Sequence, residues 1–139
     1  MARREDWQDR LAAAFETARA TPFAYGTHDC ALFIARCVDA MTDGTLIAQI
    51  AEAFTYGTEE EAAALISAAG GLEALATQFL GYPSPRNLCQ RGDVMLYDHG
   101  NGMGLGIHDG QQIIAPVIGA RSGLTGVPLE CGLMGWRII

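Results

Sequence analysis

The chain has 139 residues, of which half are hydrophobic and 18% are charged. This length and composition are typical of one folded domain and exclude a disordered chain. The 16 acidic residues outnumber the 9 basic residues and give a formal net charge of −7. A surface of that sign repels phosphate backbones and anionic lipid, so we expect no nucleic-acid partner and no membrane partner.

The first residues and the cysteines indicate a cellular setting and exclude a metal site. The N-terminal run 1–7 becomes acidic where a signal peptide would become apolar. No segment approaches the ~20 apolar residues of a membrane span. We therefore expect synthesis in the cytoplasm without a signal peptide, and free thiols. The four cysteines form no C-x-x-C pair and the three histidines lie outside zinc-finger spacing, so we expect no metal and no other cofactor.

Apolar residues at helical spacing predict helices over the first part of the chain, about residues 1–81. The first helix covers about 5–19, and the pair Thr21-Pro22 follows its end. A second helix begins at or just after Cys30, with Asp29 as its N-cap. It ends near 42–44. Shorter helices are predicted over 46–54, 58–69 and 72–80.

Short apolar runs separated by Gly, Pro and Asn turns predict strands after about residue 90. The glycine-rich run 99–104 predicts a hairpin between the first two of these strands. The predicted strands cover 93–97, 105–108, 112–116, 126–129 and 134–138. Helices followed by an antiparallel meander give an α+β class, with residues 1–139 as a single domain whose helical part packs on a sheet of about 90–139. We expect Asp93 to cap a turn, and Trp136 to close the core rather than to line a sugar site.

Cys30 is the strongest candidate for chemistry. It follows a polar loop that contains a glycine, and it opens a helix, where unpaired N–H groups and the helix dipole favour an anion. That position predicts a thiol pKa lowered from ~8.5 by a unit or more. The alternative is a small buried core residue. Cys37 resembles a core residue, whereas Cys89 and Cys131 lie in polar sequence and have no predicted role.

Several motifs in order resemble one known family. The run 22–30, Pro-Phe-Ala-Tyr-Gly-Thr-His-Asp-Cys, is followed by Arg-Gly-Asp-Val-Met-Leu at 91–96 and Leu-Gly-Ile-His-Asp-Gly at 105–110. A leading Trp-x-x-x-Leu at 7–11 and Trp-Arg-Ile at 136–138 flank them. This arrangement is similar to the NlpC-type cell-wall peptidase superfamily, and most like its short phage and prophage tail-associated members.

The resemblance implies a papain-like fold, with the cysteine at a helix start packed against a sheet that supplies a histidine and a third polar residue. It implies Cys30 as the nucleophile, with Tyr25 and Asp29 contacting substrate. The implied reaction cleaves an amide of a peptidoglycan stem peptide, and the histidine protonates the leaving amine. Synthesis in a bacterial cytoplasm, association with other phage tail proteins and a place in the virion tail are further implications.

The chain departs from the family pattern at the histidine. Gly104 stands where that residue is usual, and the third polar position falls near Ala115. Of the other histidines, His108 is expected on the same strand face but ~13 Å further along. His99 lies in the hairpin turn. His28, two residues before the cysteine, would have to fold back over the helix start.

Two hypotheses follow for the function. The first is a cysteine peptidase with Cys30 as nucleophile and His28 or His108 as base, which the retained His-Asp-Cys run favours. The second is a non-catalytic structural or assembly component of a phage tail tip, which Gly104 favours. A structure with no imidazole nitrogen within hydrogen-bond reach of the Cys30 sulfur favours the second.

Overall fold

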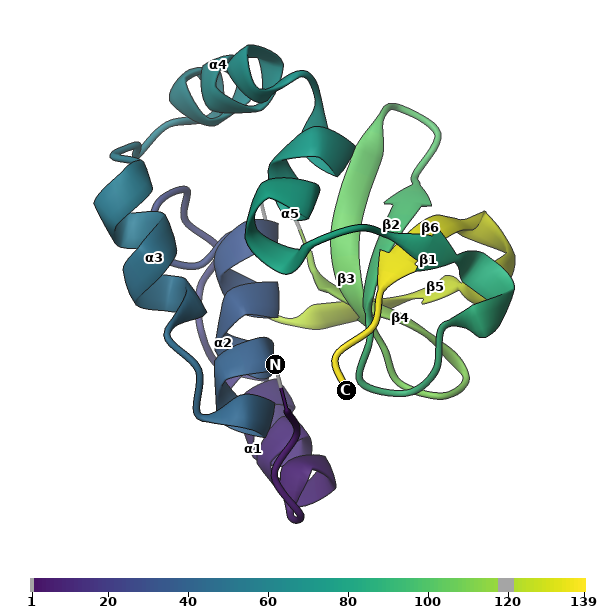
Figure 1. The fold of residues 1–139 in the computed structure, drawn as a ribbon. Coiled ribbons are helices and arrows are strands. Elements are labelled where there is room, and N and C mark those ends of the chain that lie inside the picture. Colours follow the sequence, from purple (N-terminus) through teal and green to yellow (C-terminus); the bar gives the residue numbers. More distant parts are fainter. Residues whose placement is uncertain (1, 118–121) are drawn as a thin grey trace.

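A layer of helices packs against a single antiparallel sheet, as the computed structural model shows (Figure 1). The structure describes residues 2–117 and 122–139. The chain forms its helices first and its strands afterwards, which confirms the predicted α+β class. Within the described residues the elements are α1 (Trp7–Arg19), α2 (Cys30–Thr42), α3 (Leu46–Ala53), α4 (Glu59–Ala69), α5 (Leu72–Leu80), β1 (Ser84–Pro85), β2 (Val94–Asp98), β3 (Met103–His108), β4 (Gln112–Pro116), β5 (Leu124–Pro128) and β6 (Gly132–Trp136), with short 3₁₀ turns at Arg86–Leu88 and Leu129–Cys131.

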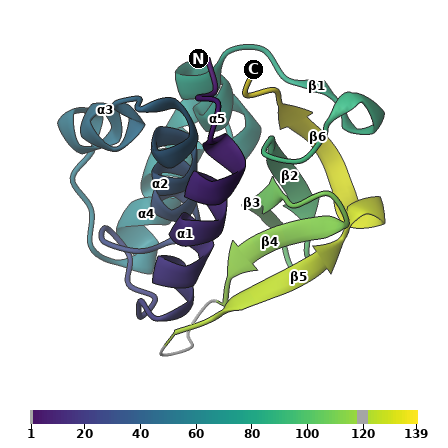
Figure 2. The same ribbon diagram turned by 90° about the horizontal axis from the view of Figure 1, so that it is seen from below.

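Helix α2 is the centre of the helical layer. It contacts α1 and α3 on one side and β3 and β4 on the other, so that little of it faces solvent (Figure 2). Its sequence is apolar almost all round, which is typical of a helix that neighbours enclose. Asp29 caps it by accepting a hydrogen bond from the Leu32 amide at 2.9 Å, which confirms the predicted start and cap.

The sheet has the strand order β1-β6-β2-β3-β4-β5. The β2–β3 hairpin forms as predicted, with Leu96 opposite Leu105 and Tyr97 opposite Gly104. Alternate side chains of these strands face opposite sides, so Leu96 and Leu105 join the main core while Tyr97 joins a smaller cluster. Trp136 is fully buried in the main core, which confirms its predicted role.

Asp93 fastens both ends of the chain to the sheet. Its fully buried carboxylate pairs with Arg3 at 2.9 Å and with Arg137 at 2.8 Å. It also accepts hydrogen bonds from the backbone amides of Gln90 and Ile138. The contact with Gln90 confirms that Asp93 caps a turn, and the two arginines bring residues near both termini together, as Figure 1 shows.

Among the described residues no single helix is long and apolar enough to cross a membrane. Helices α4 and α5 reach that length only together, and they are bent by 74° at the break between them.

Candidate functional site

Asp29 holds three segments together at the start of α2. Besides capping Leu32, it accepts hydrogen bonds from the Gly26 amide at 3.0 Å and from the Tyr56 hydroxyl at 2.6 Å. Gly26 has φ +84°, and a Cβ there would collide with the Tyr56 carbonyl, so only glycine fits. Asp29 is buried with both carboxylate oxygens engaged by protein donors. This arrangement fixes where the next residue, Cys30, projects.

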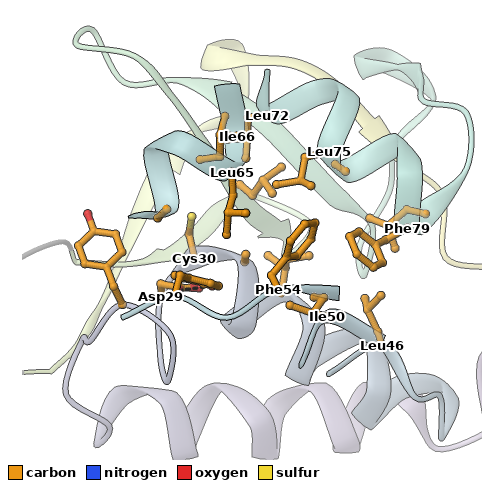
Figure 3. Close-up of a pocket in the computed structure, with 18 of the residues that line it drawn as sticks. Asp29, Cys30, Leu46, Ile50, Phe54, Leu65, Ile66, Leu72, Leu75 and Phe79 are labelled. Atoms are coloured by element: carbon orange, nitrogen blue, oxygen red, sulfur yellow. Dashed lines mark hydrogen bonds between the residues drawn. The ribbon is translucent and has the colours of Figure 1, made fainter. Parts of the chain in front are cut away.

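The Cys30 thiol projects into an apolar pocket and is only partly exposed (Figure 3). Burial, together with the negative charge of Asp29, raises its pKa to about 11. The backbone N–H groups of Leu105, Ala31 and Cys30 itself face the sulfur and oppose this shift, but less strongly. The predicted lowering of the thiol pKa is therefore wrong, because loss of hydration outweighs the helix start.

None of the three histidines forms a hydrogen bond with Cys30. His28 is buried, with Nδ1 3.0 Å from the Arg36 guanidinium and its ring edge-on to Phe33. Burial and the Arg36 charge lower its pKa. The Arg36 contact makes Nδ1 an acceptor, so the ring is neutral with its proton on Nε2. The structure therefore gives His28 a bracing role in the loop.

His108 and His99 lie elsewhere on the sheet. His108 Nδ1 accepts a hydrogen bond from the Gly110 amide at 3.0 Å, and its ring lines a separate hollow beside Cys89. Burial lowers the pKa of His108. His99 lies in the β2–β3 turn with its ring edge-on to Tyr97 at 6.3 Å. Cys89 is itself buried rather than in polar surroundings as its sequence suggested.

A phenol occupies the space beside Gly104. A Cβ at Gly104 would lie 2.7 Å from both Cζ and the hydroxyl oxygen of Tyr97, so the tyrosine ring lies across this position. The next residue, Leu105, directs its amide at the Cys30 sulfur. Burial and the charge of Cys30 raise the pKa of Tyr97 to about 12. Position 104 therefore lies close to the thiol, but Tyr97 fills the room for a side chain there.

Ala115, near which the resemblance predicts a third polar residue, is fully buried in the same cluster as Tyr97 and carries no polar group. The sequence contained one overlooked signal for this arrangement. The predicted hairpin around 99–104 places residues 97 and 104 opposite one another, and a glycine opposite an aromatic residue leaves space for the ring.

An apolar pocket extends beyond Cys30. It has a volume of about 870 Å³, including the part that is open to solvent, and it lies between α3, α4, α5 and the start of α2. Figure 3 shows the sulfur at one end, Phe54 and Phe79 side by side further in, and leucine and isoleucine side chains around them.

Polar groups gather only at the Cys30 end of this pocket. Tyr25 and Tyr56 line it beside Asp29. Burial raises the pKa of Tyr25, and the charges of Glu59, Cys30, Asp29 and Glu60 act in the same direction. Burial and the hydrogen bond to Asp29 raise the pKa of Tyr56 as well. The surroundings of the thiol are therefore apolar and negative. Substrate contact by Tyr25 and Asp29 stays a prediction.

In the part of the chain that the structure describes, no group of three or more His, Cys, Asp or Glu side chains is placed to hold a metal ion.

Comparison with known proteins identifies the family. The chain belongs to the family described as a domain of unknown function, DUF6950, whose model matches residues 2–138. No curated protein matches the chain.

Proposed function

We propose that this chain is a papain-like domain of the NlpC type that no longer hydrolyses amides, and that it serves as a structural or assembly component of a phage-type tail tip. The order of motifs along the chain supports the relationship. The position of Cys30, at the start of a helix that packs against β3, is consistent with it.

The observation that carries the proposal is that the Tyr97 ring fills the space that a side chain at position 104 would need. Tyr97 lies where the family histidine would project, and no imidazole forms a hydrogen bond with the Cys30 sulfur. Loss of general acid–base help costs roughly 10²–10⁴-fold in rate. With a thiol pKa raised to about 11, Cys30 is almost entirely protonated at neutral pH.

Active cysteine peptidase chemistry on peptidoglycan is the second candidate. It is favoured by the Cys30 sulfur, which faces a pocket and is approached by three backbone N–H groups. Such donors stabilise a thiolate or a developing oxyanion. The enzyme would still need a group to protonate the leaving amine, and the Tyr97 phenol, with its raised pKa, is the titratable side chain nearest to position 104.

Amine release from peptidoglycan separates the two candidates. Purified protein is incubated with peptidoglycan sacculi beside an active NlpC-type endopeptidase as positive control, and new amines are counted. We expect no release above that of Cys30→Ala. Release by the wild-type protein that Cys30→Ala abolishes would overturn the non-catalytic proposal.

The tail assignment has its own test. Particles are purified from a strain that carries the gene and are analysed by mass spectrometry. We expect the chain in intact particles and in isolated tails. Its presence in the cell lysate only, with none in the particles, would remove the structural role.

A further inference from the structure

The pocket beside Cys30 has a chemical character of its own. Its polar side chains are Tyr25, Asp29, Cys30 and Tyr56, all at one end. Every other residue that lines it is apolar. These residues come from α2, α3, α4, α5 and β3, together with Phe23 before α2 and Phe54 directly after α3. An apolar lining with a few polar groups gathered together is typical of small-molecule sites.

The helices around this pocket leave apolar surface uncovered. Helix α4 has no fully buried residue, although Ala62, Leu65 and Ile66 all line the pocket and are half-buried. In α5 only Ala76 is fully buried. An apolar ligand would remove this surface from water, and each methylene so buried is worth roughly fourfold in affinity.

The charges near Tyr25 and Asp29 disfavour an anionic ligand. Glu59 and Glu60 form the first turn of α4 and act on Tyr25 at the pocket. Among the ion pairs of the described residues none reaches Asp29, so its charge is not compensated by a cation. A peptide with several carboxylates would lose hydration here without gaining a cationic partner.

We infer that this pocket binds an uncharged molecule with an apolar chain, which lies between Phe54 and α4–α5 with its polar end beside Cys30, Tyr25 and Tyr56. The inference goes beyond the proposed structural role and concerns the same Cys30 site, which we propose no longer hydrolyses amides. A neutral occupant fits both the apolar lining and the acidic rim.

Two neighbouring alanines of α4 provide a matched test. Ala62 lines the pocket, whereas Ala63 is exposed and lies outside it. The probe is N-phenyl-1-naphthylamine, an uncharged dye that fluoresces in apolar sites, with 1-dodecanol and dodecanoate as competitors. We expect dye binding, displacement by dodecanol, and weaker displacement by the anionic dodecanoate. Ala62→Phe should weaken dye binding by about tenfold or more, and Ala63→Phe by less than about twofold.

Folding and the identity of the site are checked separately. Circular dichroism and thermal unfolding establish that both variants are folded, and Leu65→Trp provides a second blocked pocket if Ala62→Phe does not fold. Bound dodecanol should also slow alkylation of Cys30 by N-ethylmaleimide in the wild-type protein. Absence of dye binding, or equal binding by the two alanine variants, overturns the inference.

Two further outcomes keep this inference distinct from the proposed function. A dimer that Ala62→Phe disrupts would make a second copy of the chain the occupant and would overturn the small-molecule assignment. Amine release from peptidoglycan in the presence of normal dye binding would overturn the non-catalytic proposal and leave the ligand class standing.

Discussion

The molecule holds two buried carboxylates in contrasting surroundings. Asp93 accepts hydrogen bonds from two backbone amides and pairs with Arg3 and Arg137. Asp29 also caps a segment and is almost as deeply buried, but its donors are two amides and the Tyr56 hydroxyl, all of them neutral.

This difference separates a structural clamp from a candidate site. A buried charge that is paired with cations holds segments together, and its field on neighbouring groups is largely cancelled by those cations. A buried charge without a cation imposes its field on its neighbours, and beside Cys30 it adds to the burial that raises the thiol pKa. The two aspartates therefore mark where the chain is held and where a ligand can approach.

Removing Asp93 should have the largest effect. Asp93→Ala leaves two arginines without their partner and frees both chain ends, so we expect the free energy of unfolding to fall by about 3 kcal/mol. Urea unfolding followed by tryptophan fluorescence measures it. The control is Asp9→Ala on the exposed face of α1, with a change within about 0.5 kcal/mol. A loss similar to that of the control would show that Asp93 is not a clamp.

A histidine at position 104 should be rejected by Tyr97. The side chain would overlap the phenol, so we expect Gly104→His to lower the free energy of unfolding by about 1–3 kcal/mol. The same substitution in a Tyr97→Ala background should cost less, because the clash is gone. Gly57→His, at an exposed glycine with no atom near its Cβ position, is the control. Equal costs in both backgrounds would contradict the assigned position of Tyr97.

Neutralising Asp29 should lower stability less than the two preceding substitutions do, and it should change the reactivity of the Cys30 thiol. Asp29→Asn keeps one cap oxygen and loses an acceptor, so we expect a fall of about 1 kcal/mol in the free energy of unfolding. Loss of the negative charge should lower the Cys30 pKa and speed its alkylation at fixed pH. Asp9→Asn should change neither quantity. Slower alkylation in Asp29→Asn would contradict the claim that the Asp29 charge raises the Cys30 pKa.

Mild acid should weaken the loop that precedes Asp29. Burial lowers the pKa of His28 below its ordinary value of 6.5, so the unfolded chain takes up a proton before the folded one. Stability is therefore full above about pH 6.5 and is lost as the pH falls from there toward the folded pKa. Melting temperatures between about pH 7.5 and 5.5 should fall less in His28→Gln than in wild type. His99→Gln, in the exposed turn, is the control. If the melting temperature falls equally with pH in all three proteins, His28 is not the source of the acid sensitivity.

Local signals in the sequence predicted most of the fold. Apolar spacing and caps located the helices, including the start of α2 at Cys30 and its end near Asp43, and the glycine-rich turn located the β2–β3 hairpin. The strand β1 was missed. It has two residues, one of them proline, and it forms only because β6 lies beside it.

The site was less predictable, because its properties arise from contacts between distant segments. The helix start at Cys30 predicted a lowered thiol pKa, but burial of the sulfur and the charge of Asp29 raise it instead. Helical periodicity also placed Phe54 and Phe79 in predicted helices, but it did not indicate that the two rings line a pocket. Asp93 was recognised as a cap, but its two arginine partners lie 90 and 44 residues away along the chain.

The central claim is that Cys30 has no base, and the pH dependence of its alkylation tests that claim most directly. Cys37 and Cys89 are buried, so replacing the partly exposed Cys131 by serine leaves Cys30 as the accessible thiol. With iodoacetamide and mass spectrometry, we expect the rate at Cys30 to rise about tenfold per pH unit between about pH 7 and 9, without a plateau. A rate that is high and flat from about pH 5 to 8 would reveal a thiolate paired with a cationic base, and would contradict the account.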